Sequence, residues 1–229
     1  MALAAVVLIS AVLILVIIRF EQVRPRPRDL MPVVVLAALA ILGRLLFTPI
    51  PNFQPTTAII ILAGLYFGRN SGLLCGMVVA FVSNFFVGQG LWTPWQMLLW
   101  GLIGYFAGVT GQRISMSFDM SVSDTGLSPL TSANTSNYLT CTVERPLNTM
   151  FMYIYGAVAS FLFGIIMDLQ FFISYTYSSG WGGLITSLLA GLPMNVLHAV
   201  STVVFLAATL IPWGRKLARL KTKYGIKAF

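Results

Sequence analysis

The chain has 229 residues, of which 58% are hydrophobic and only 9% are charged, with a formal net charge of +8 at pH 7. A soluble domain carries about 25% charged residues, so this composition excludes a soluble globular protein and predicts an all-α integral membrane protein. The basic residues lie in short segments that border hydrophobic runs, which is typical of membrane anchoring and argues against nucleic-acid binding.

The first hydrophobic run covers residues 1–18, and we expect a transmembrane helix over residues 1–20. Neither a charged leader nor a small-residue cleavage site precedes its apolar core, so we interpret it as a retained helix rather than a cleaved signal peptide. The charged linker EQVRPRPRD follows at residues 21–29, and its prolines predict a break in the helix.

Six further hydrophobic runs follow along the chain. They cover residues 30–47, 57–67, 72–87, about 95–111, 149 to about 175, and 183–212. Residues 30–212 therefore predict a membrane domain of six helices. A polar stretch rich in serine and threonine interrupts this domain at residues 113–147, and its lack of an apolar period predicts a cytoplasmic loop. The basic segment 213–229 is expected to be a cytoplasmic tail.

The lysines and arginines predict the orientation in the membrane. They follow the first, third and fifth runs and fill the C-terminal tail, whereas the connections PIPNFQPT, GQGLWTPW and SYTYSSGWG contain none. Basic connections stay in the cytoplasm, so the pattern predicts seven crossings with the N-terminus outside and the C-terminus in the cytoplasm.

Aromatic and amide side chains gather at the connections predicted to lie outside. The stretch NFFVGQGLWTPWQMLLW at residues 84–100 holds three of the five tryptophans. An aromatic belt at the membrane interface would explain the rings alone. It does not explain the amides at the same level, whereas an organic ligand needs both aromatic area and hydrogen bonds. The amides in question are Asn52, Gln54, Asn84, Gln89 and Gln96.

Three ionisable residues fall inside hydrophobic runs. Arg44 and Asp168 are expected at similar depth, either as an ion pair that ties two helices together or at the floor of an outward-facing cavity. His198 is either a ligand-binding residue or a neutral, hydrogen-bonded histidine of the core. Small residues also recur at helical spacing, as in Gly72, Gly76 and Ala80, and predict closely packed helices.

Signals for catalysis, metals and cofactors are weak. The chain has a single histidine, two cysteines (Cys75 and Cys141) and none of the common hydrolase or phosphate-binding motifs. We therefore expect no enzyme, no metal site and no cofactor, and any active transport would need an energy source on another chain. Two alternatives stay open: an intramembrane hydrolase that uses His198 with Ser201 or Asp168, and a membrane scaffold without a small ligand.

The run from GRLLFTPIPNFQPTTAII to WQMLLWGLIGYFAG, residues 43–108, resembles the substrate-binding S components of energy-coupling-factor (ECF) vitamin transporters, and GLPMNVLHAVSTVVFL with the basic tail is also similar to that family. The resemblance is closest to the cobalamin branch. It implies a six-helix S-component bundle, here preceded by one extra N-terminal transmembrane helix, in a bacterial cell membrane. The family's spaced alanine pair for docking the coupling subunit is missing, and only a stripe of small residues (Ala37, Ala38, Ala40 and Gly43) takes its place.

The resemblance also implies a function and a site. Such a subunit binds a bulky vitamin, here with a corrinoid as the best match, and delivers it with a membrane-embedded coupling (T) subunit and two cytoplasmic ABC-type ATPases. Positions that correspond to the family's pocket are Gln54, Asn84, Gln89, Trp92, Trp95, Gln96, Asp168 and His198.

Overall fold

The computed structural model describes residues 7, 9–11, 13–14, 18, 26–124 and 146–226. The expected helix at residues 1–20 lies mostly outside these residues. Its described positions are helical, and Ile9 and Leu13 pack in a small apolar cluster with Met77. A crossing by this segment stays a prediction.

The described part of the chain is helical and contains no strand, in agreement with the predicted class. Its α-helices are α2 (Pro27–Leu46), α3 (Thr56–Phe67), α4 (Arg69–Val87), α5 (Thr93–Asp124), α7 (Pro146–Phe171) and α8 (Gly180–Lys223). Each corresponds to one of the six predicted hydrophobic runs, although the runs 30–47 and 149–175 extend slightly past the ends of α2 and α7. Three helical stretches are long and apolar enough to cross a membrane, namely Pro27–Leu46, Arg69–Val87 and Asn148–Lys221. The protein is therefore a membrane-embedded α-helical protein.

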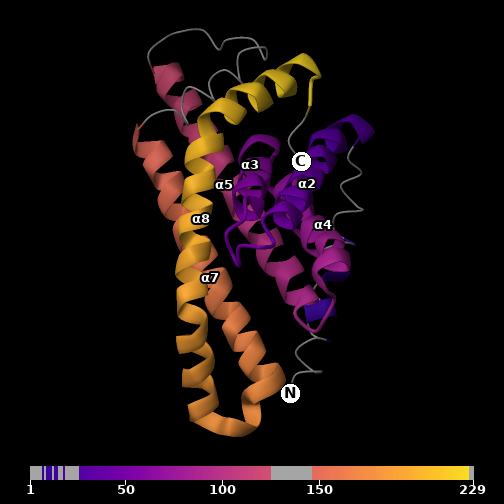
Figure 1. The fold of residues 1–229 in the computed structure, drawn as a ribbon. Helices are drawn as coiled ribbons and strands as arrows, with labels where there is room; N and C mark the ends of the chain where they lie inside the picture. Colours follow the sequence, from indigo (N-terminus) through magenta and orange to yellow (C-terminus); the bar gives the residue numbers. More distant parts are fainter. Residues whose placement is uncertain are drawn as a thin grey trace.

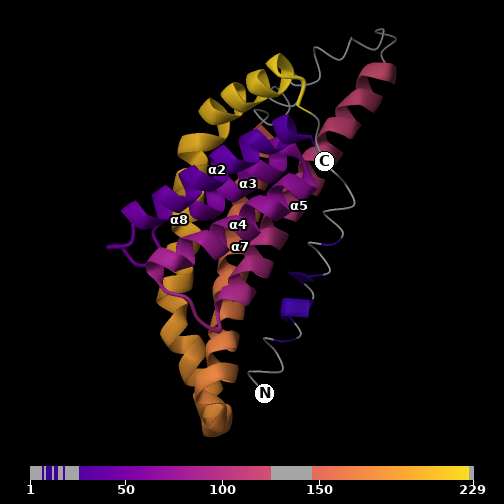
Figure 2. The same cartoon turned by 90° about the vertical axis from the view of Figure 1, so that its right-hand side faces the viewer.

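Helix α3 forms the centre of the molecule, because all twelve of its residues are buried. It packs against α2, α4, α5 and α8, which surround it in Figures 1 and 2. The chain leaves α3 and enters α4 at Gly68, whose φ of 103° favours glycine. This one-residue break allows two apolar helices to pack side by side.

Helices α7 and α8 form a long hairpin that extends well beyond the ends of the other helices (Figures 1 and 2). Two short turns, η1 (Phe172–Thr176) and η2 (Tyr177–Ser179), connect them. α8 contains Pro193 and Pro212, and its C-terminal part turns across the bundle in Figure 1. α7 packs mainly on α8 and only slightly on α5, so the hairpin is a distinct part of the fold.

One predicted boundary was wrong, and two other helices extend into the segments expected to be a tail and a linker. The loop expected at residues 113–147 begins later, because α5 continues to Asp124, and residues 125–145 lie outside the described part. Neither glycine nor proline occurs between Gly111 and Gly126, so nothing in the backbone stops the helix. The tail expected from residue 213 likewise continues α8 as far as Lys223, and α2 begins inside the predicted linker at Pro27, where proline is well tolerated.

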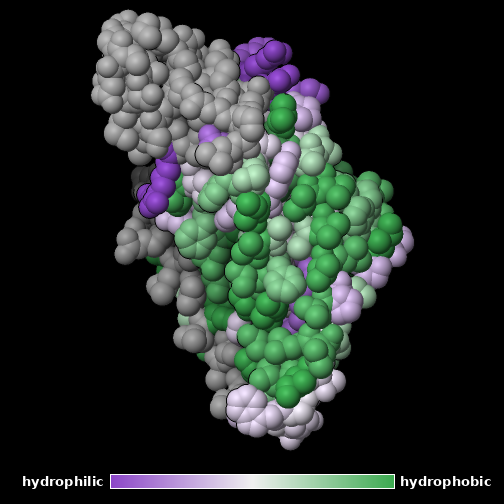
Figure 3. Space-filling view, turned by 90° about the vertical axis from the view of Figure 1, so that its left-hand side faces the viewer, coloured by the Kyte–Doolittle hydropathy of each residue, from purple (hydrophilic) through white to green (hydrophobic). Residues whose placement is uncertain are grey.

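Basic residues from separate segments meet at one end of the molecule. Arg28 and Lys216 line the same groove, and the Lys221 ammonium donates a hydrogen bond to the carbonyl of Tyr66, 3.0 Å away, close to Arg69 in the sequence. Figure 3 shows strongly hydrophilic residues at this upper end, above a surface that is mostly hydrophobic. This arrangement agrees with the predicted grouping of basic connections on one side; which side of the membrane it is stays a prediction.

Candidate functional site

A buried arginine is the hub of a polar network near the end of α2. Arg44 is only 7% exposed, although it lies in a helix that is apolar enough to cross the membrane. Its Nη1 donates hydrogen bonds to Ser83 Oγ and, at 2.8 Å, to Asn84 Oδ1 on α4. The guanidinium carbon also lies 5.0 Å from the ring centroid of Trp100 on α5. Arg44 therefore joins three helices through neutral partners and an aromatic face.

Asn84 extends the network to the beginning of α5. Its Nδ2 donates to Gln96 Oε1 at 2.8 Å and to Thr93 Oγ1 at 3.0 Å. The Thr93 hydroxyl in turn donates to Gln89 Oε1 at 2.8 Å, and Gln89 Nε2 donates to the carbonyl of Phe81 at 3.1 Å. The amides of the α4–α5 connection are thus held in fixed positions by one another.

Trp100 connects this cluster to the hairpin. Its indole N–H donates to Thr57 Oγ1 at 3.1 Å, and the same hydroxyl lies 2.9 Å from His198 Nε2 on α8. The Phe163 ring of α7 stacks on Trp100 with centroids 5.1 Å apart and meets His198 edge to face at 5.3 Å. We call the residues Arg44, Thr57, Ser83, Asn84, Gln89, Thr93, Gln96, Trp100 and His198 the central network.

The expected ion pair between Arg44 and Asp168 is wrong. Asp168 accepts a hydrogen bond from Asn195 Nδ2 at 2.6 Å, and the acceptors of Arg44 are neutral. α2 packs on α3 and α4, whereas α7 packs mainly on α8, so similar depth in the membrane does not make these helices neighbours. An ion pair that the described residues do form joins Arg26 Nε to Asp29 Oδ2 at 2.9 Å, at the start of α2.

The structure brings together only some of the predicted site residues. Asn84, Gln89, Gln96 and His198 belong to the central network. Gln54, Trp92, Trp95 and Asp168 do not. Trp95 packs against the apolar cluster of Ile9 and Leu13, and the Trp92 ring lies so close to Gly90 that a Cβ there would overlap it. Gln54 is held through its backbone, because its N–H donates to Ser201 Oγ at 2.8 Å and its carbonyl accepts from the same hydroxyl.

The residues proposed for the alternative hydrolase have separate partners. Ser201 bonds to the backbone of Gln54, His198 contacts Thr57, and Asp168 contacts Asn195. A nucleophile and its base need a mutual hydrogen bond. The contacts of the three residues assemble no such pair. No group of three His, Cys, Asp or Glu side chains able to hold a metal occurs in the part of the chain that the structure describes.

Sequence reasoning missed Thr57, Ser83, Thr93 and Trp100 as site residues. Trp100 lies in an apolar run and is 1% exposed, so its pattern is that of a core residue. Ser83 and Thr57 are completely buried and carry one hydroxyl each. These residues could have been found from the rule that a buried polar group needs a hydrogen-bond partner. The rule applies to Ser83, which lies beside Asn84, and to the two threonines at residues 56–57.

Polar pairs also link α7 and the turn η1 to α8. Asp168 pairs with Asn195, the hydroxyls of Ser160 and Thr202 lie 2.7 Å apart, and those of Thr176 and Ser187 lie 3.2 Å apart. Glycines face these pairs, since a Cβ on Gly164 would overlap the Asn195 amide and a Cβ on Gly191 would overlap the Asp168 carboxylate. We call these three pairs the hairpin ladder.

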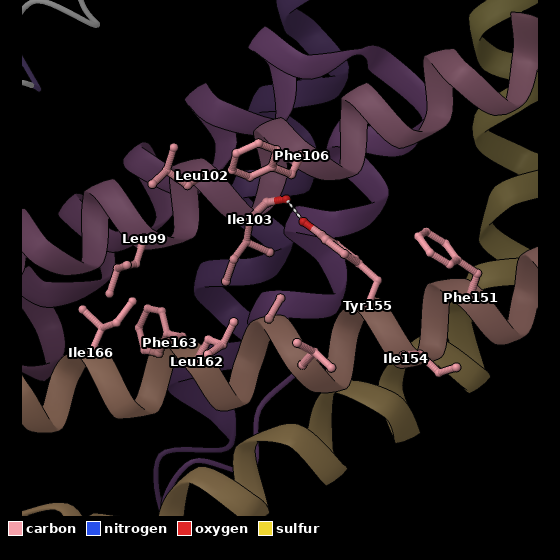
Figure 4. A pocket seen from close by; sticks show the side chains of 12 residues that line it. Leu99, Leu102, Ile103, Phe106, Phe151, Ile154, Tyr155, Leu162, Phe163 and Ile166 are labelled. Atoms are coloured by element: carbon pink, nitrogen blue, oxygen red, sulfur yellow. Dashed lines mark hydrogen bonds between the residues drawn. The ribbon is translucent and has the colours of Figure 1, made fainter.

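Three cavities are lined by described residues, and none of the three is lined by a predicted site residue. One of about 430 Å³ lies between α5 and α7, and Figure 4 shows side chains from both helices that line it, such as Phe106 of α5 and Phe151 and Phe163 of α7. It is almost wholly apolar, and the Tyr155 hydroxyl beside it donates to the Ile103 carbonyl at 2.6 Å. The polar side chains of the central network hydrogen-bond to one another, and the open, tryptophan-walled cup suggested by the sequence stays a prediction.

A family model matches the chain over residues 21–213, and its description is a family of unknown function (DUF6580). No solved structure matches the chain.

Proposed function

The chain belongs to the DUF6580 family, whose function is unknown, and we propose that it is the substrate-capture subunit of an ECF-type vitamin uptake transporter. It binds an organic solute at the end of the bundle that carries the lysine-free connections, on the outer side of a bacterial cell membrane. A coupling (T) subunit and two cytoplasmic ATPases then drive release of the solute to the inside. The sequence resemblance to S components and the all-helical membrane architecture support this proposal.

The observation that carries the proposal is the central network. Arg44 lies near the end of α2 but is only 7% exposed, and a buried charge is costly unless polar groups surround it, so its burial calls for an explanation. Its contacts converge with amides, hydroxyls and the ring of Trp100 from α2, α3, α4, α5 and α8. A core with a purely structural role would be more stable with leucine in place of these polar side chains. A binding site, in contrast, needs convergent polar groups beside aromatic faces.

The network also favours a class of solute. Arg44 carries a positive charge, and its hydrogen-bond acceptors Ser83 and Asn84 are neutral, so an anionic group on the solute would gain a charge-assisted hydrogen bond. Gln96 and Asn84 can exchange their mutual hydrogen bond for bonds to amide groups of the solute. A bulky vitamin with amide groups and broad apolar faces fits these groups, and a corrinoid is the first ligand to test.

Access to the network involves the α2–α3 connection. This connection is attached to α8 by Asn52 Nδ2, which donates to the carbonyl of Met194 at 3.2 Å, and by the paired bonds between Gln54 and Ser201. Ser201 lies one helical turn from His198, so the connection ends beside the network. We propose that its release from α8 admits the solute.

The test is a binding assay with purified protein and a panel of vitamins that includes corrinoids. We expect one vitamin to bind with a Kd below 1 μM, which corresponds to about −8 kcal/mol, and to raise the Tm of the protein. Arg44→Met and Gln96→Ala should each weaken binding at least tenfold. Gln112→Ala is the matched control, because Gln112 lies on the same helix at the opposite, basic end.

One result would contradict the capture role, and another would contradict the assignment of its site. If no vitamin binds or raises the Tm, the chain fits a membrane scaffold without a small ligand. If a vitamin binds equally well to the wild type, Arg44→Met and Gln96→Ala, the capture role stands but the central network is not its site.

A further inference from the structure

A groove of about 820 Å³ lies between the beginning of α2 and the C-terminal part of α8. Its α2 wall includes Met31, Val35 and Leu39, which are 67%, 56% and 39% exposed. Its α8 wall includes Trp213 and Leu220. The groove forms because α8 turns across the bundle after Pro212, as Figure 1 shows, and leaves a space against α2. Its volume lies within the range of specific small-molecule sites, about 300–1,000 Å³.

The groove is apolar along its walls and positively charged at its rim. Arg28 and Lys216 line it and are exposed, and they come from different helices. The carboxylate of Asp29 pairs with Arg26 at 2.9 Å, and the charged residues that line the groove, Arg28 and Lys216, are both cationic. The charge of the groove is therefore positive.

The groove extends from an apolar helix to the basic end of the molecule, which is where a membrane interface is expected. Its α2 wall belongs to a helix that is long and apolar enough to cross the membrane, whereas its rim belongs to the basic end of the molecule. Trp213 and Tyr224 line it, and these residue types are enriched at the boundary between hydrocarbon and head groups. A ligand that fills this groove has an apolar part on the membrane side and an anionic part on the basic side.

We propose that this groove is a binding site for one anionic phospholipid, with its phosphate between Arg28 and Lys216 and an acyl chain along Val35 and Leu39. Basic pockets between transmembrane helices recognise anionic head groups in this way. A second copy of the chain is a poorer occupant, because a symmetric contact through the rim would bring the same cations of both copies together. The site is separate from the central network and does not depend on the proposed transport function.

The experiment measures lipids retained by the purified full-length protein in native mass spectrometry, after incubation with equal amounts of phosphatidylglycerol and phosphatidylcholine. We expect one phosphatidylglycerol to be retained in preference. The double variant R28Q/K216Q should lower its apparent affinity about 30-fold, since each cation near an anionic lipid contributes about 1 kcal/mol and 1.4 kcal/mol is tenfold. Both side chains are exposed, so folding should be preserved, and an unchanged Tm would verify it.

The control R113Q/R219Q removes the same charge from two exposed residues that do not line the groove, and it should retain the lipid as the wild type does. Val35→Trp should fill the groove and reduce retention at unchanged charge. Equal retention of both lipids, an equal loss in R113Q/R219Q, or full retention in Val35→Trp would overturn the proposal. A second polypeptide that is retained in place of lipid and lost in Val35→Trp would assign the groove to a protein partner and overturn it as well.

Discussion

The α3–α4–α5 region and the α7–α8 hairpin hold their helices together in different ways. In the first region backbones touch, since a Cβ on Gly64 or on Gly72 would overlap the carbonyl of Gly104. In the hairpin, side chains make the connection, as between Asp168 and Asn195. Backbone contact leaves no room for adjustment, whereas hydrogen-bonded side chains can exchange partners. The difference indicates a stiff core and a hairpin whose position can change.

The central network lies where these two regions meet. Asn84 and Trp100 come from the glycine-packed region and are joined by Arg44 of α2, whereas Phe163 and His198 come from the hairpin. A solute that binds there would contact both regions and so depend on their relative position. Breaking each region separately tests this division.

The largest effect is expected from Gly104→Ala. The new Cβ would meet the backbone of Gly72, and backbone cannot move aside as the end of a flexible side chain can. Overpacking of this kind costs typically 1–3 kcal/mol, and we expect about 3 kcal/mol and a marked fall in Tm, measured by thermal unfolding in detergent.

Gly182→Ala is the matched control for that variant. Gly182 lies in α8, and a Cβ there has no atom within 4 Å, so its Tm should stay the same or rise slightly because alanine favours the helix. Equal Tm values for Gly104→Ala and the wild type would show that the core is not stiff, and the comparison between the two regions would fail.

An intermediate effect is expected from Asn195→Leu, which breaks the ladder pair with the carboxylate. The leucine is similar in size, but Asp168 would lose the donor that lies 2.6 Å away. Hydrogen bonds between membrane helices average about 0.6 kcal/mol and reach about 1.7, and we expect a value near the upper end because the acceptor is a carboxylate. Ser160→Ala removes a hydroxyl–hydroxyl pair of the same ladder and should cost about 0.6 kcal/mol. Equal losses in the two variants would refute a special role for the charged pair.

The sequence predicted the number and order of the described helices because each has a continuous apolar run. It was less successful at their ends. α5 extends to Asp124 through a polar stretch, since polar residues without glycine or proline permit a helix that leaves the membrane. Hydropathy detects where a segment enters lipid, and it does not detect where the helix stops.

The site was predicted in part for a similar reason. The amides Asn84, Gln89 and Gln96 lie within thirteen consecutive residues, and their proximity in the sequence correctly predicted a cluster. The pairing of Arg44 with Asp168 rested on depth alone, and depth does not determine which helices are neighbours. Thr57 and His198 are 141 residues apart, and only the packing of α3 against α8 brings them within hydrogen-bonding distance.

The smallest effect is expected at this junction, from Thr57→Val combined with a substitution on α8. Valine keeps the shape of Thr57 but removes the hydroxyl that contacts both Trp100 Nε1 and His198 Nε2. In a double-mutant cycle with His198→Leu, we expect a coupling free energy of about 0.6 kcal/mol, the average for a hydrogen bond between membrane helices. The same cycle between Thr57→Val and Ser160→Ala should give a coupling near zero, because the Ser160 hydroxyl pairs with Thr202.

If ligand binding depends on the relative position of the two regions, Thr57→Val should also weaken vitamin binding by more than its small effect on Tm implies. A coupling of zero between Thr57 and His198 would mean that this hydrogen bond does not contribute to the contact between α3 and α8, and the central network would then not link the two regions.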